Sequence, residues 1–117
     1  MDFKTYQELS ARTAASLGNK ELDNLHMVLG IGTESGELQD VFKKQLAYKR
    51  DPDWTNVIEE AGDLMWYIAN LCTINNLDFD KILEKNVEKL RARYPEMFTE
   101  YDATHRDLGK ERKILEG

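Results

Sequence analysis

The sequence predicts an all-α fold of four to five helices that assembles as an oligomer. Apolar residues recur at helical spacing over most of the 117 residues, and no segment alternates between apolar and polar residues as a strand would. The only two prolines, Pro52 and Pro95, fall where helices have to stop, which leaves long uninterrupted stretches between them. The length favours one domain with a small core.

Each expected helix is bounded by residues that disfavour helical backbone. The first ends at Gly18, the second before Pro52 and the third at Asn75, whereas Asp78 or Asp80 can cap the fourth. The expected helices span residues 2–17, about 21–48, about 54–75 and, from that cap, up to about 93.

The second and third helices carry more apolar surface than a chain of this size can cover. The second is apolar on more than one side, so we infer that the protein self-associates. We assign residues 1–98 to a helical domain and residues 99–117 to a polar arm with one short helix, which can take part in the oligomer interface. The third helix has one broad apolar face, formed by Trp54, Val57, Ile58, Ala61, Leu64, Met65, Ile68, Leu71 and Cys72.

Three glycines, Gly30, Gly32 and Gly36, crowd the middle of the second helix, and Gly62 lies in the third. A glycine inside a helix costs roughly 1 kcal/mol against alanine. Two explanations remain open, namely close approach of the two helices and room for a ligand between them.

Two acidic pairs lie in these helices: Glu34 with Glu37, and Glu60 with Asp63. Residues three apart share one face of a helix, so two adjacent helices would bring four carboxylates into one pocket. Like charges repel and burial adds to the cost, which a divalent cation relieves. Glu60 flanks the apolar face of the third helix, whereas its neighbour Glu59 points away from it, so Glu60 is the stronger ligand candidate.

A polar stripe on the fourth helix supplies positive charge. Asn86, Lys89 and Arg93 share one side of that helix. Lys44 lies about two turns beyond Glu37 on the same face of the second helix. Side chains of this kind can hold the phosphate oxygens of a ligand that is bound through a metal at the carboxylates.

The composition disfavours several classes of function. A net charge of −6 argues against electrostatic binding to nucleic acid or to an anionic membrane. The single cysteine, Cys72, rules out an internal disulfide and a cysteine-based zinc site, and we expect an inert buried thiol in a reducing, cytoplasmic compartment. No apolar run reaches about 18 residues, and the N-terminus lacks the pattern of a signal peptide.

Four segments together resemble the MazG-like, all-α nucleoside triphosphate pyrophosphohydrolases. The signature of that family is ExxE, a spacer and then ExxD, and the resemblance covers about residues 22–98. The segments are TESGEL at 33–38, Lys43-Lys44, EEAGDLMWYIA at 59–69 and NVEKLRARYP at 86–95.

The resemblance implies a Mg²⁺-dependent enzyme, with Mn²⁺ as a possible substitute, that hydrolyses a (d)NTP to (d)NMP and pyrophosphate and so clears unwanted nucleotides. It also implies a homodimer or homotetramer with each site near a subunit interface. The implied metal ligands are Glu34, Glu37, Glu60 and Asp63, and Glu37 is our candidate general base. The implied substrate ligands are Lys44, Asn86, Lys89 and Arg93, with Trp66 or Tyr67 available to stack on a base.

Simpler interpretations remain open. The acidic residues could form a solvated face, the cations could be ordinary surface charges, and Trp66 and Tyr67 could pack in the core or at an interface. His26 is expected to be a core or interface residue. The alternative function is a non-catalytic nucleotide-binding module or sensor on the same fold. A ferritin-like di-metal bundle is disfavoured, because neither histidine follows a glutamate by three residues.

Overall fold

The computed structural model describes residues 1–117 and contains six helices and no strand, which confirms the all-α class. The second, third and fourth helices lie within a residue or two of their expected positions. None of the six combines the length and the apolar character that crossing a membrane requires. The helices are α1 (Phe3–Ala11), α2 (Lys20–Tyr48), α3 (Trp54–Ile74), α4 (Phe79–Arg93), α5 (Glu100–Thr104) and α6 (Leu108–Glu116).

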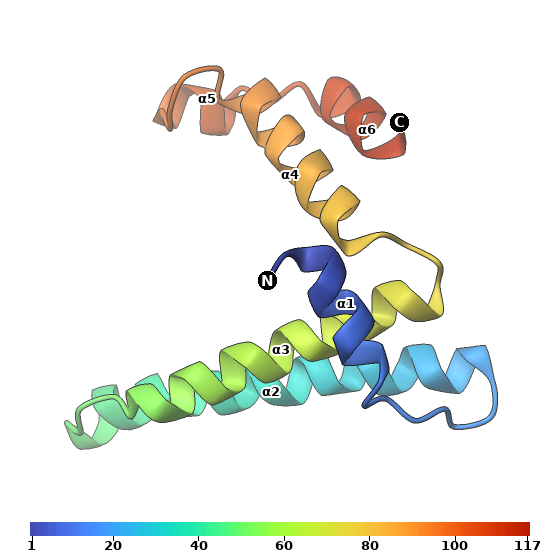
Figure 1. Ribbon diagram of the computed structural model, residues 1–117. Helices are drawn as coiled ribbons and strands as arrows, with labels where there is room; N and C mark the ends of the chain where they lie inside the picture. The colour runs from blue at the N-terminus through green and yellow to red at the C-terminus, as the bar shows by residue number, and fades with distance from the viewer. The chain divides into compact units, whose positions relative to one another are not determined.

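The chain forms two compact units, residues 1–77 and residues 78–117. In the first unit, α2 and α3 lie side by side as a long antiparallel hairpin, and α1 packs against α3 (Figure 1). This hairpin carries both of the acidic pairs noted in the sequence.

Polar side chains fix both ends of the α2–α3 hairpin. The carboxylate of Asp53 accepts hydrogen bonds from the backbone N–H groups of Thr55 and Asn56 at 3.1 and 3.3 Å, which caps α3. At the other end, the side-chain amides of Asn24 and Asn75 bond each other at 3.3 and 2.7 Å. The Asn24–Asn75 pair therefore ties α2 to α3 at the end away from the turn, whereas Asp53 fixes where α3 begins.

The first helix is shorter than the predicted span of residues 2–17, because the residues after Ala11 contact the start of α2 instead. The hydroxyl of Ser16 and the backbone N–H of Leu17 donate to the carboxylate of Asp23 at 2.8 and 2.6 Å. Gly18 follows with a φ of +105°, a backbone conformation that favours glycine. The helix thus ends several residues before the glycine that was expected to stop it.

In the second unit, α4 and α6 pack around a buried carboxylate. Glu111 is 3% exposed and accepts from Arg93 at 2.7 Å and from Arg106 at 3.0 Å. Burial alone would raise the pKa of Glu111, but the hydrogen bonds from the two guanidinium groups outweigh it, and the pKa is lowered. Two helices, α5 and α6, occupy the region that was expected to hold one.

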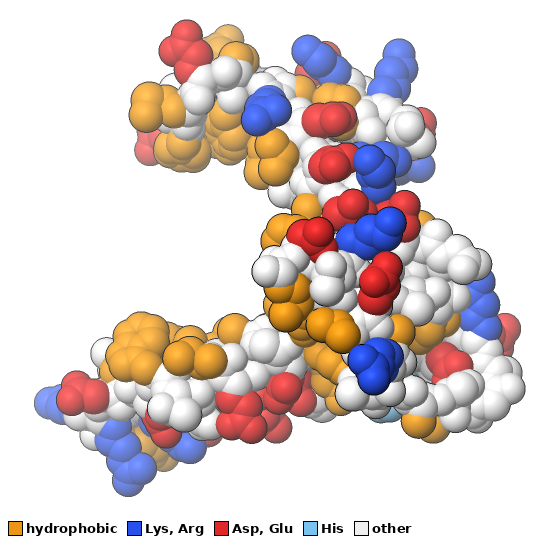
Figure 2. Space-filling model, viewed as in Figure 1, with side chains coloured by type: hydrophobic (Ala, Val, Ile, Leu, Met, Phe, Trp, Pro, Cys, Tyr) orange, Lys and Arg blue, Asp and Glu red, His pale blue; other side chains and the backbone are white.

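The buried core of the first unit is small. Cys72 is buried, as expected, and its burial raises the pKa of the thiol. The first part of the apolar face of α3 is not covered by the other helices of the first unit, since Trp54 is 63% and Ile58 74% exposed. Figure 2 shows hydrophobic side chains gathered on the surface near the α2–α3 connection. Large exposed apolar residues on α2 are Leu22, Leu25, Val28, Leu29, Phe42, Leu46 and Tyr48.

Candidate active site

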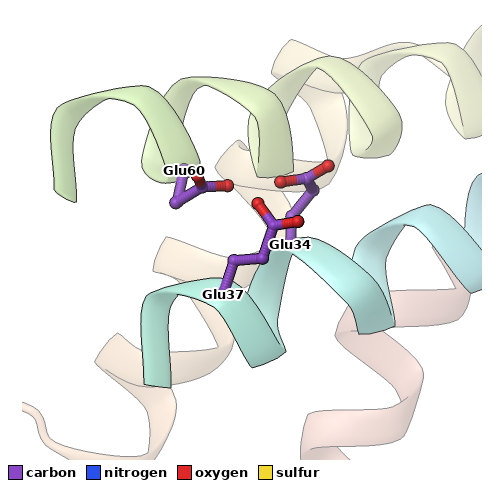
Figure 3. A group of neighbouring side chains, drawn as sticks. All are labelled: Glu34, Glu37 and Glu60. Atoms are coloured by element: carbon purple, nitrogen blue, oxygen red, sulfur yellow. The ribbon is translucent and has the colours of Figure 1, made fainter. Parts of the chain in front are cut away.

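Three glutamates from two helices meet within the α2–α3 hairpin. Glu34 and Glu37 come from α2 and Glu60 from α3, and their side chains point toward one another (Figure 3). One carboxylate oxygen from each residue lies within 4.8 Å of the others. The three-residue spacing on α2 turns both of its carboxylates toward α3, which explains the convergence.

This cluster is electrostatically costly without a cation. Glu60 is 5% exposed, and one carboxylate oxygen of Glu34 and one of Glu60 are buried without a hydrogen-bond partner. Side-chain hydrogen bonding to Glu34 and then Glu37, together with burial and the charges of both neighbours, raises the pKa of Glu60 to about 8. At neutral pH such a carboxyl binds either a proton or a metal ion.

The donor set fits a divalent cation of the magnesium type. Mg²⁺ takes oxygen ligands, usually one or a few carboxylates completed by water and substrate phosphates. The buried oxygens of Glu34 and Glu60 lack any other partner and are the atoms that a cation would satisfy. Glu37 is the exposed member of the three and is open to solvent.

Asp63, the fourth predicted ligand, stands apart from this group. It lies on α3 one turn after Glu60, is exposed, and is not among the carboxylates that converge within 4.8 Å. It could reach a cation held by the cluster by changing its side-chain rotamer, or through a bridging water. Its role as a metal ligand stays a prediction.

A pocket of about 660 Å³ opens beside the carboxylates, a size that suits a nucleotide-sized ligand. The sequence did not single out Asp40, which continues the three-residue spacing on α2, or Asn56, one turn before Glu60. Glu59, expected to point away from the apolar face of α3, is exposed and also lines the pocket. The walls are Thr33, Gly36, Glu37 and Asp40 from α2, and Asn56, Glu59 and Glu60 from α3.

Lys44 is the predicted phosphate ligand that lies in the same unit as the carboxylates. Its ammonium group pairs with Asp40 at 2.8 Å, and this hydrogen bond, with a second from Lys43, lowers the pKa of Asp40. Lys44 also lines a smaller pocket together with Arg50 and Asn56. Exposed ion pairs along a helix are weak, so an incoming phosphate could replace Asp40 as the partner of Lys44.

Three other predicted phosphate ligands lie on α4 in the second unit. Asn86 is exposed and Lys89 is half-buried. The side chain of Arg93 is 15% exposed and donates to Glu111, so it is already committed to an ion pair within its own unit. The role of these three residues toward a substrate stays a prediction.

Trp66 and Tyr67 pack inside the first unit. The indole N–H of Trp66 donates to Thr13 Oγ1 at 2.8 Å, so the segment after α1 covers this side of α3. The ring of Tyr67 meets Trp66 and His26 edge-on, with centroid distances of 5.0 and 6.0 Å. Base stacking by either aromatic residue stays a prediction.

The two explanations left open by the sequence account for two of the four glycines of the hairpin, Gly30 and Gly36. A Cβ at Gly30 would lie well inside 3.0 Å of the Tyr67 ring, so close helix approach explains this glycine. A Cβ at Gly32, Gly36 or Gly62 would meet no neighbouring atom within 4 Å, so close approach within the chain explains none of these. Gly36 lines the acidic pocket, where its missing side chain leaves space for a ligand.

The sequence matches a known family over most of its length. Residues 23–98 match the model described as "MazG nucleotide pyrophosphohydrolase domain". A similar protein is the Gene 37 protein of Mycobacterium phage L5, which is 29% identical over 104 residues that cover 80% of this chain and 89% of that protein. No solved structure matches the chain.

Proposed function

The chain belongs to the MazG nucleotide pyrophosphohydrolase domain family, and on that premise we propose that it hydrolyses a (d)NTP to (d)NMP and pyrophosphate with Mg²⁺. The observation that carries this proposal is the convergence of Glu34, Glu37 and Glu60 beside a nucleotide-sized pocket. The reaction consumes one water and breaks the anhydride linkage between the α- and β-phosphates. Its role would be the removal of unwanted nucleotides from the cytoplasmic pool.

All three glutamates contribute to the proposed metal site, and one of them has a second part. Glu34 and Glu60 would hold the cation through their buried oxygens, with Glu37 as a further ligand. Glu37 is exposed and lines the pocket, so it can accept a proton from the attacking water. A bound Mg²⁺ would neutralise the phosphates, favour ionisation of that water and stabilise charge on the departing pyrophosphate.

The acidic character of the pocket makes metal and substrate binding interdependent. Asp40 and Glu59 line the pocket beside the cluster, and every charged residue of its lining is acidic, so a triphosphate that arrives alone is repelled. With the cation held, the phosphates become favourable ligands, and Lys44 can exchange its contact with Asp40 for a phosphate oxygen. We therefore expect tight nucleotide binding only in the presence of a divalent cation, with Mn²⁺ able to replace Mg²⁺.

We also propose that the protein is a homodimer or homotetramer. Exposed apolar residues lie toward both ends of the hairpin, with Leu25 and Leu29 near the Asn24–Asn75 pair and Trp54 and Ile58 at the start of α3. Exposed apolar surface of this kind marks protein–protein interaction sites. A second copy would cover this surface, and the site would then lie near the subunit interface.

The products of the reaction test the proposal. The protein is incubated with a panel of standard and modified (d)NTPs, with Mg²⁺ or with EDTA, and monophosphate, pyrophosphate and orthophosphate are quantified. We expect equal amounts of monophosphate and pyrophosphate from at least one nucleotide, and only with the cation. Orthophosphate and a diphosphate as products would contradict the proposed bond cleavage. Binding of nucleotides without turnover of any would favour the sensor alternative.

A further inference from the structure

The helices of the hairpin meet closely where Tyr67 of α3 packs against Gly30 of α2. Gly30 is buried, and a Cβ there would overlap ring carbons Cδ1, Cε1 and Cζ of Tyr67. A tyrosine ring can occupy this place only because position 30 has no side chain. The distance between the two helices here is therefore set by the thickness of one aromatic ring against bare backbone.

This contact is in register with the carboxylate cluster. On α2, Glu37 comes seven residues after Gly30. On α3, Glu60 comes seven residues before Tyr67. Seven residues make about two helical turns, or about 10 Å, so each pair shares one face of its helix. Because the helices are antiparallel, both steps run in the same direction along the hairpin (Figure 1). A change in helix separation at Gly30 would consequently reach the glutamates.

Two other aromatic rings border the half-buried ring of Tyr67. His26 and Trp66 contact it edge-on, at interplanar angles of 77° and 90°. Trp66 is itself held by its hydrogen bond to Thr13. Closely packed interiors transmit added volume as displacement, so a methyl group at position 30 has to displace the ring, the helices or both, and either change alters this contact between α2 and α3.

We propose that Gly30 and Tyr67 form a spacer that positions the glutamates of α2 against Glu60 for metal binding. This inference rests on the proposed metal site and concerns residues that do not themselves bind the ion. Mg²⁺ and Mn²⁺ require oxygen ligands at short, well-defined distances, about 2.0–2.1 Å for Mg²⁺. Loss of a residue that supports a metal site typically weakens metal affinity by about 10- to 100-fold.

The test is the affinity of the substrate-free full chain for Mn²⁺, measured from the electron paramagnetic resonance signal of the free ion. Gly30→Ala should bind Mn²⁺ about 10- to 100-fold more weakly than wild type, with helix content retained by circular dichroism. Gly109→Ala is the matched control, because it adds the same methyl group to α6 where only Asp107 Oδ1 lies within 4 Å, at 3.7 Å. It should bind Mn²⁺ as wild type does.

A second substitution separates the spacer from a general loss of stability. Tyr67→Leu alone should also weaken Mn²⁺ binding, about tenfold or more. Combined with Gly30→Ala it should bind more tightly than Gly30→Ala does, since the smaller side chain leaves room for the methyl group. If the fold-losses of Mn²⁺ affinity in the two single variants simply multiply in the double variant, the spacer proposal is wrong. If Gly30→Ala does not fold, wild-type affinity in Tyr67→Leu overturns it.

The outcomes also separate the spacer from the site on which it depends. Failure of the wild type to bind Mn²⁺ contradicts the metal site, and the spacer with it. Tight wild-type binding with the same affinity in Gly30→Ala contradicts the spacer alone.

Discussion

Competition between a proton and a cation at Glu60 gives a quantitative prediction. The pKa of this carboxyl is raised to about 8 by its contacts with Glu34 and Glu37 and by burial. At pH 7 it is therefore about nine-tenths protonated, and at pH 9 about one-tenth. Metal binding needs the carboxylate, so binding of one Mg²⁺ should release about 0.9 proton at pH 7 and about 0.1 proton at pH 9.

The same shift fixes how stability depends on pH in the metal-free protein. The folded-state pKa of Glu60 lies above its ordinary value of 4.5, so the folded protein binds the proton more tightly than the unfolded chain does. This contribution to stability is complete below pH 4.5 and is lost as the pH rises toward about 8. In EDTA, the melting temperature should fall across that window, and Mg²⁺ should restore it most at the alkaline end.

Isothermal titration calorimetry in two buffers of different ionisation enthalpy measures the number of protons released. The melting temperature in EDTA is followed in parallel by circular dichroism. Glu60→Gln should bind Mg²⁺ weakly, and its melting temperature should be nearly flat between pH 5 and 8. Equal proton release at pH 7 and pH 9 would refute this explanation of the cluster. So would a wild-type melting temperature in EDTA that does not fall as the pH rises.

Three further predictions concern stability and assembly. Glu111→Gln should lower the melting temperature at pH 7, because two guanidinium groups lose their partner, and the difference should shrink as the pH falls below 4.5; the exposed Glu116→Gln serves as the control. Thr13→Val should lower the free energy of unfolding, measured in urea, by about 1 kcal/mol or more, because the hydroxyl also donates to the Ser10 carbonyl; the loss should be smaller in a Trp66→Phe background, where the bond from Trp66 is already absent. Ile58→Glu should reduce the mass found by light scattering, and a monomeric wild type would contradict self-association.

Local sequence patterns were sufficient to predict the α2–α3 hairpin and the convergence of its carboxylates. Pro52 and the capping Asp53 define the turn between α2 and α3, and the glutamates converge because three-residue spacing on a helix fixes their direction. The sequence also predicted which of two adjacent glutamates is buried. Glu60 is buried and Glu59 is exposed, because only Glu60 flanks the apolar face.

Features that depend on distant contacts could not be predicted in the same way. The early end of α1 depends on Asp23, which bonds the segment after the helix and leaves no local pattern. Arg93 shares a helix face with Lys89, but its partner Glu111 comes from a region with weak periodicity. Helical periodicity likewise cannot tell a core from an interface, so the exposure of Ile58 emerged only from the structure.

The central claim is that the three glutamates form a metal site that supports hydrolysis of a nucleoside triphosphate. Its most direct test is the rate of Mg²⁺-dependent pyrophosphate release by Glu37→Gln, beside wild type and the exposed α1 control Glu8→Gln. We expect Glu37→Gln to stay folded and to lose turnover by at least about 100-fold, since it loses both a charged metal ligand and the candidate base. Glu8→Gln should match wild type. Full activity in Glu37→Gln would contradict the assignment of the site.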